Sequence, residues 1–248
     1  MSGHSKWSTI KHKKAKVDAA RGISFQKFSR EIIMAAKLGG GDPAGNFRLR
    51  TAIERAKQAG LPNDNIKRAI DKGAGNGGAD NFEEITYEGY ANGGVAVFIE
   101  AMTDNRNRTA GDIRSYFTKY QGNLAENGCV GWMFKKVGLI LFDKNIDYEK
   151  LFDDSVNAGA DDIEEDDDNY RVLTAPETLA EVVSNLESAG YKPVSAEITR
   201  IPENTVEVTD EKVAASVLKL MEKLEEHDDV QNVYSNFDID DEILQNIE

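Results

Sequence analysis

Cysteine is almost absent from this sequence, since Cys129 is the only one among 248 residues. A single cysteine excludes a disulfide within the chain and is typical of a reducing compartment. No run of about 18 apolar residues occurs, so we expect no membrane-spanning helix and no membrane partner. The first residues carry lysine and histidine without an apolar segment after them, unlike a secretory signal. These absences predict a folded, cytoplasmic protein.

Motifs of catalysis and of metal binding are also missing. The three histidines, His4, His12 and His227, lack the spacing of metal ligands, and no GxSxG or HExxH motif occurs. A GxGxxG pattern at 73–78 follows a predicted helix and precedes a predicted strand, the reverse of the order in dinucleotide-binding folds. We therefore expect that the protein is not an enzyme and that it holds no metal and no cofactor.

An acidic run at 161–169, DDIEEDDDN, is equally unlike a calcium loop. An EF-hand needs glycine at its sixth position and glutamate at its twelfth, and the run has neither. We predict instead the edge of a hairpin, where charges prevent pairing with another chain.

What the sequence does have is charge of opposite sign in its two parts. Residues 1–75 contain 16 Lys and Arg and 6 Asp and Glu, whereas the remainder contains 14 and 38. This asymmetry predicts that the basic part contacts a polyanion and that the acidic part stays away from it. The alternative is that the two parts neutralise each other within one molecule.

Helical spacing dominates the basic part. Residues 1–22 lack apolar periodicity and predict a flexible arm, or a helix that orders on binding. Apolar residues three and four apart predict helices over 24–41, 46–60 and 63–73, the third capped by Asn63 or Asp64. Three short helices joined by tight turns form a small bundle.

Beyond the glycine-rich linker at 73–80, strands alternate with helices. We predict a hairpin over 132–142 and a helix that begins at Pro176. Two segments, 186–202 and 224–240, each read as a helix followed at once by a strand, and each strand needs a sheet to pair with. The pattern predicts two α+β sandwiches of the split βαβ, or ferredoxin-like, type.

The resulting fold class is α+β with three domains. We predict a basic arm and helical bundle over 1–79, a discontinuous α+β domain over 80–131 plus 203–248, and an inserted acidic α+β domain over 132–202. Chain order alone also permits simple tandem domains.

Two segments of the folded part are candidates for contact with nucleic acid. In the segment 54–70, Ala56, Gly60 and Ile66 fit a helix-turn-helix, whose second helix would present Asn63, Asn65, Lys67 and Arg68. An ordinary helical hairpin uses the same residues. Arg106 and Arg108 lie where a strand leads into a helix and can bind an anion there, unless Asp104 and Asp112 hold them in local ion pairs.

The arm is the strongest candidate, because lysines, histidines and one tryptophan alternate along it. Lysines neutralise phosphates, and an indole can stack on a base, whereas a tail that serves only solubility has little use for Trp7. The residues predicted to contact nucleic acid are His4, Lys6, Trp7, Lys11, His12, Lys13, Lys14, Lys16, Arg21, Lys27, Arg30, Lys37, Arg48, Arg50, Lys67, Arg68, Arg106 and Arg108.

Several blocks of the sequence resemble the YebC/PmpR family. They are GHSKW at 3–7, KHKKAKVDAARG at 11–22, AAKLGGGDP at 35–43 and YEGYANGGVAVFIEAMTDNRNRT at 87–109. The family covers bacterial probable transcriptional regulators and a mitochondrial translational activator. The resemblance implies a helical domain followed by two α+β domains, the middle one discontinuous, and a non-enzymatic, cytoplasmic role in binding nucleic acid.

Two hypotheses for the function stay open. The first is a DNA-binding regulator of transcription. The second is a translation factor that binds ribosomal RNA and helps synthesis of difficult sequences such as proline runs, an activity that the resemblance implies. In both, the acidic domains act as a spacer or bind a protein partner.

Overall fold

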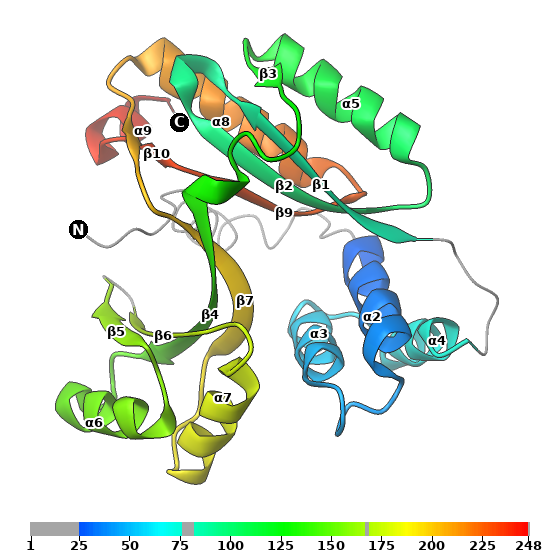
Figure 1. The fold of residues 1–248 in the computed structure, drawn as a ribbon, viewed down its shortest axis with the longest axis vertical. Helices are drawn as coiled ribbons and strands as arrows, with labels where there is room; N and C mark the ends of the chain where they lie inside the picture. Colours follow the sequence, from blue (N-terminus) through cyan, green and yellow to red (C-terminus); the bar gives the residue numbers. More distant parts are fainter. Residues whose placement is uncertain (1–24, 76–81, 167–168, 248) are drawn as a thin grey trace. The chain divides into compact units, whose positions relative to one another are not determined.

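The computed structural model of the chain describes residues 25–75, 82–166 and 169–247 (Figure 1). The chain forms two compact units: one consists of Phe134–Ile201, and the other of the described residues up to Met133 and from Pro202 onward. Helices come first, and two sheet-containing parts follow, so the fold class is α+β as predicted. No helix in the described ranges is both long and apolar enough to cross a membrane.

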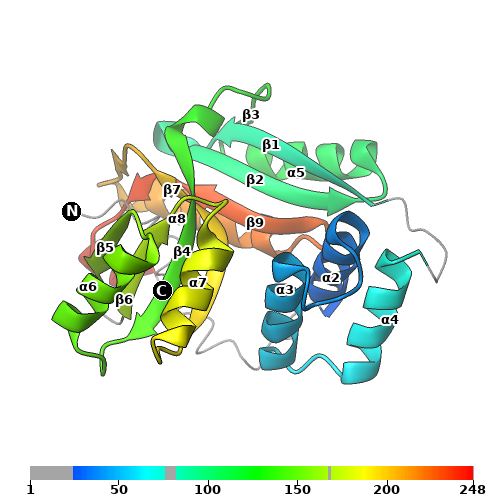
Figure 2. The ribbon, with the colours of Figure 1, turned by 60° about the horizontal axis from the view of Figure 1, so that its bottom comes forward.

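Three helices come first among the described residues of the larger unit: α2 (Phe25–Gly39), α3 (Phe47–Gln58) and α4 (Asn63–Gly73). Their apolar residues meet in one core, in which Ile32, Leu49 and Ala56 are fully buried. Helices α3 and α4 both pack against α2, and Figure 2 shows the three side by side. The predicted helical bundle is therefore present.

The junction between α2 and α3 depends on Asn46. Its side chain accepts a hydrogen bond from the Leu49 N–H and donates to the carbonyls of Ala35 and Gly40, both at 2.8 Å. The predicted cap of α4 is wrong, because Pro62 occupies the cap position and makes no side-chain bond there. Asn63 lies in the first turn of the helix instead.

Glycine at position 73 has a role that sequence analysis missed. A Cβ atom there would lie 2.3 Å from the Ile33 carbonyl oxygen and 2.7 Å from the Ala36 Cβ. Gly73, the last residue of α4, therefore allows this helix to approach α2 closely.

The sheet of the larger unit has the order β3-β1-β2-β9, and all neighbours are antiparallel. Its strands are β1 (Glu83–Tyr90), β2 (Ala96–Thr103), β3 (Asn123–Leu124) and β9 (Val230–Ser235). A 3-10 turn, η1 (Asn92–Gly94), joins β1 to β2. Strands β1 and β2 form a hairpin before α5 (Arg106–Lys119). The order of elements therefore differs from the split βαβ pattern, in which a helix follows the first strand.

One face of this sheet packs against α5 (Arg106–Lys119) and α8 (Glu211–Glu226). Ile99 of the sheet, Phe117 of α5 and Leu220 of α8 are fully buried in the shared core. Two further short strands, β8 (Val206–Glu207) and β10 (Phe237–Asp238), pair in parallel, and α9 (Asp241–Ile247) packs against α8. Strand β9 follows Phe134–Ile201 in the chain, so the sheet uses residues from both sides of that segment.

The smaller unit has the sheet order β5-β6-β4-β7, which is the ferredoxin-like order. A 3-10 turn, η2 (Gly131–Met133), precedes it. Its elements are β4 (Phe134–Asp143), α6 (Tyr148–Ala158), β5 (Asp162–Glu165), β6 (Asn169–Thr174), α7 (Leu179–Ser188) and β7 (Ser195–Pro202). The acidic strand β5 lies at the edge of the sheet, as predicted.

Two expectations for this unit are wrong. The predicted hairpin over 132–142 is the single strand β4, because Gly138 makes a close contact and not a turn: a Cβ there would lie 2.3 Å from Thr174 Oγ1. The predicted helix start at Pro176 is three residues early, since the Thr178 N–H bonds the Ala175 carbonyl in a turn before α7.

Candidate nucleic-acid interface

Half of the predicted interface lies outside the described residues. These are the arm residues His4, Lys6, Trp7, Lys11, His12, Lys13, Lys14, Lys16 and Arg21. The other nine residues belong to the larger unit. Arg30, Arg48, Arg106 and Arg108 pair with carboxylates. Lys27 donates to a carbonyl, and Lys37, Arg50, Lys67 and Arg68 are exposed on the helical bundle.

Arg48 of α3 has two carboxylate partners. Its Nε lies 2.8 Å from Glu31 Oε1 of α2, and its Nη2 lies 2.5 Å from Glu84 Oε1 of β1. Burial opposes the charge of Arg48, but hydrogen bonds and attraction from both glutamates outweigh burial and raise the pKa of the guanidinium. Arg48 thus connects the bundle to the first strand of the sheet.

Asp229 is the centre of a second ionic cluster. Its carboxylate is buried and accepts hydrogen bonds from Arg30 at 2.7 Å, Arg108 at 2.8 Å, Thr109 at 2.7 Å and Thr103 at 3.2 Å. Burial alone raises the pKa of Asp229, but the hydrogen bonds from Arg108 and Thr109 and the charges of both arginines hold it below the ordinary value. The carboxylate is therefore ionised at neutral pH.

The residues around Asp229 extend this cluster. His227 Nε2 lies 3.3 Å from Asp112 Oδ2, and His227 Nδ1 accepts the Asp229 N–H at 3.1 Å. That acceptor role assigns the proton of a neutral ring to Nε2, so the ring donates to Asp112. Lys27 donates to the Glu225 carbonyl at the end of α8, where the helix dipole favours a positive charge.

The two arginines after β2 are also paired. Arg108 contacts Asp104 at 2.9 Å as well as Asp229, and Arg106 contacts Glu83 at 3.3 Å. In the sequence analysis, an ion pair with Asp104 was the alternative to an anion site at Arg108. The structure contains this ion pair. Sequence analysis missed Asp229, because no short-range pattern connects it to residues more than a hundred positions earlier.

The exposed cations are on the surface of the bundle. Lys37, Arg50, Lys67 and Arg68 are all exposed. Lys37 donates to the Phe82 carbonyl at 3.3 Å, and Arg68 donates to Asn65 and to the Asp64 carbonyl of its own helix.

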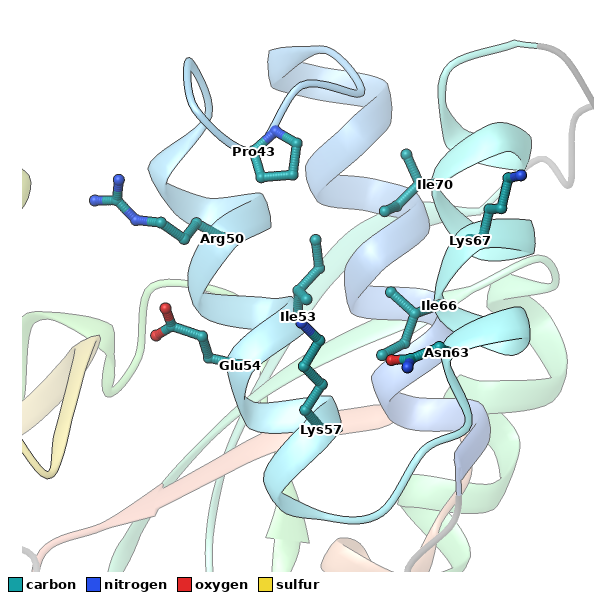
Figure 3. Close-up of a pocket in the computed structure, with 9 residues that line it drawn as sticks. All are labelled: Pro43, Arg50, Ile53, Glu54, Lys57, Asn63, Ile66, Lys67 and Ile70. Carbon is teal, nitrogen blue, oxygen red and sulfur yellow. The ribbon is translucent and has the colours of Figure 1, made fainter.

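A groove separates α3 from α4 on this surface, with a volume of about 400 Å³. Figure 3 shows Ile53 of α3 facing Ile66 and Ile70 of α4 across it. Its remaining lining residues are Pro43, Arg50, Glu54, Lys57, Asn63 and Lys67.

Lys57 belongs to the groove, although the sequence analysis did not select it. Its side chain extends toward Ile53 in Figure 3. The signal was present in the sequence, because positions 50, 53, 54 and 57 share one face of a helix. Three cations and one acid, Glu54, thus surround an apolar floor.

Two further features concern metal binding and the reactivity of the cysteine. No group of three or more metal-ligating side chains occurs in the part of the chain that the structure describes. Cys129 lies in a turn and is partly buried, and burial followed by the charge of Glu88 raises the pKa of its thiol. A raised pKa disfavours the reactive thiolate.

A basic helical bundle followed by two sheet-containing parts defines a class of α+β proteins, and comparison with known families gives its name. The family model described as the TACO1/YebC protein N-terminal domain matches residues 5–76. The model described as the TACO1/YebC second and third domain matches residues 82–237. The chain belongs to the TACO1/YebC family, which confirms the resemblance found in the sequence.

Relatives match over the full length. A probable transcriptional regulatory protein of Geobacter sp. (strain M21) is 56% identical over 245 residues, 99% of each chain. One from Desulfotalea psychrophila is 56% identical over 248 residues, 100% of this chain and 99% of the relative. The crystal structure of a conserved hypothetical protein from Aquifex aeolicus has a TM-score of 0.82 and 50% identity, and covers 93% of this chain and 96% of that one.

Proposed function

We propose that this protein is a DNA-binding regulator of transcription that acts through its basic N-terminal part. The observation that carries the proposal is the group of exposed cations on α3 and α4, namely Arg50, Lys57, Lys67 and Arg68. Exposed lysines and arginines on adjacent helices can neutralise phosphates at little cost in desolvation. The names of the relatives, probable transcriptional regulatory proteins, support the same role.

The arm and the bundle have different tasks in this proposal. The arm residues, including Trp7, supply most of the contacts to phosphate and base. Arg50 and Lys67 fix the bundle on the backbone of the nucleic acid. The arginines that carboxylates already hold, Arg30, Arg48 and Arg108, contribute less, because a phosphate must compete with a carboxylate less than 3 Å away.

The second candidate is a translation factor that binds ribosomal RNA, and α4 supports it. Two of the side chains predicted to face a DNA groove, Asn65 and Arg68, are hydrogen-bonded to each other. A helix whose polar groups are used internally is poorly suited to read base edges, whereas a basic arm suits folded RNA. In either role we propose that the protein is cytoplasmic and is not an enzyme.

Crosslinking in cells, followed by sequencing of the bound nucleic acid, tests the proposal. Enrichment of promoter DNA is the expected result. Enrichment of ribosomal RNA would instead select the translation factor, and enrichment of neither would overturn both. A chain that begins at Ser24 serves as the control in binding assays, because it lacks the arm and should bind DNA and RNA much more weakly.

A further inference from the structure

The groove between α3 and α4 has a chemical counterpart on the surface of α6. The outer face of α6 exposes Phe152 and Val156, whose side chains are 42% and 56% exposed. They are four residues apart and so lie on one stripe of the helix. Glu149 and Asp153, both exposed, share that stripe. We define the acidic stripe as Glu149, Phe152, Asp153 and Val156.

The groove presents the opposite pattern. Ile53, Ile66 and Ile70 form its apolar floor. Arg50, Lys57 and Lys67 supply three positive charges at its rim, and Glu54 supplies one negative charge, so the rim is basic on balance. Both helices contribute residues at spacings of three, four and seven, which is how a helical groove receives a third helix. An apolar floor with a rim that is basic on balance therefore complements an apolar stripe with acidic flanks, both in helical spacing and in charge.

We propose that the acidic stripe of one copy of this chain docks into the groove between α3 and α4 of a second copy. Phe152 and Val156 would cover the three isoleucines, while Glu149 and Asp153 would face Lys57 and Lys67. The inference does not rest on the proposed function, because it concerns protein free of nucleic acid.

The proposed contact joins two different surfaces, so it allows more than two copies to associate. Because the donor stripe and the acceptor groove differ, the contact is heterologous. A bound pair therefore still offers one free groove on the copy that donated its stripe and one free stripe on the copy that accepted it. Association should therefore continue beyond two copies as the concentration rises. One helix in one groove buries less area than a standard interface, so the association should be weak and sensitive to salt.

Sedimentation of the full chain, treated with nuclease and at low salt, measures this association. The donor variant is F152S/V156S, and the acceptor variant is K57E/K67E. We expect each to weaken self-association at least about tenfold, the scale of central interface residues. V194S removes an exposed apolar side chain from the same unit as the stripe, and K135E reverses an exposed charge on β4. Both controls should associate like the original chain.

Mixing the two variants provides the decisive test. The donor variant keeps its groove and the acceptor variant keeps its stripe, so a mixture can form one contact and then stops at a 1:1 complex. Circular dichroism establishes that both variants are folded. A mixture that stays monomeric, or an original chain that stays monomeric at millimolar concentration, would overturn the proposal, as would a closed dimer that the variants leave intact.

Discussion

Arg30 of α2 and Asp229, which follows α8, form an ion pair of 2.7 Å between Nη1 and Oδ1. The arginine side chain is 15% exposed and the aspartate side chain 2% exposed. Arg30 also donates to the Asp228 carbonyl, so it contacts two successive residues of the loop. An arginine that sequence analysis assigned to nucleic acid thus connects the helical bundle to the residues that lead into β9.

Replacing Asp229 should destabilise the protein markedly. In D229A, Arg30 and Arg108 lose a carboxylate, and Thr103 and Thr109 lose an acceptor. We expect the free energy of unfolding to fall by about 2–3 kcal/mol, below the full range for a buried pair because Arg108 is half exposed. Denaturant unfolding measures the change. D104N removes the exposed carboxylate that pairs with Arg108. This variant should lower the free energy of unfolding by less than about 0.5 kcal/mol.

The same carboxylate predicts an acid-sensitive stability. The pKa of Asp229 is lowered in the folded state from an ordinary value of 3.8. Its contribution is therefore fully present above the unfolded pKa, and it is lost as the pH falls below about 4 and through the folded pKa. Unfolding between pH 2 and pH 7 measures this dependence, and D229N should have a shallower acid limb. An equally steep limb in D229N would show that other carboxylates cause it.

Gly73 should not tolerate a methyl group. G73A places a Cβ against the Ile33 carbonyl and the Ala36 side chain, so α4 must move away from α2. We expect a loss of about 1–3 kcal/mol, the cost of overpacking, although alanine otherwise favours helices. G45A is the matched control, because a Cβ at Gly45 meets no atom within 4 Å. Equal stability of both variants in thermal unfolding would contradict the close approach of the helices.

Glu88 should hold the turn that contains Cys129. Its buried carboxylate accepts N–H bonds from Gly128 at 2.8 Å and from Val130 and Gly131 at 2.7 Å. In E88Q, an amide NH₂ faces an N–H donor and the negative charge is lost. We expect about 2 kcal/mol of destabilisation.

The reactivity of Cys129 provides an independent measurement on the same variant. Because burial and the charge of Glu88 raise the pKa of the thiol, E88Q should lower it and accelerate alkylation at neutral pH. An unchanged alkylation rate would show that the turn does not depend on this carboxylate.

The exposed cations of the bundle should determine the salt dependence of nucleic-acid binding. R50A/K67A should weaken binding to all sequences and flatten the slope of log K against log salt by about 1.4–1.8, for two lost phosphate contacts. K135A/K136A removes two exposed lysines from β4 of the smaller unit and should leave the slope of log K against log salt unchanged. A slope that changes only when Lys11, Lys13, Lys14 and Lys16 are replaced would assign binding to the arm alone.

Local patterns in the sequence determined the helices of the bundle. The predicted ranges 24–41, 46–60 and 63–73 contain α2, α3 and α4, because apolar residues three and four apart make a helix amphipathic wherever it packs. The acidic edge strand β5 was also predictable from a local pattern, because a run of charged residues is typical of a strand at the edge of a sheet. The chain forms two compact units. The division into three domains stays a prediction.

Only the tertiary structure decided which charges face outward and which glycines make contacts. Gly138, which lies within the predicted hairpin over 132–142, is in close contact with Thr174 and Leu179 instead, and Arg30, predicted to contact nucleic acid, is paired with Asp229. Lys57 belongs to a groove because α3 and α4 both pack on α2 and leave a gap between them. Sequence periodicity reports which face of an element is buried, whereas the partner of that face depends on contacts between residues far apart in the chain.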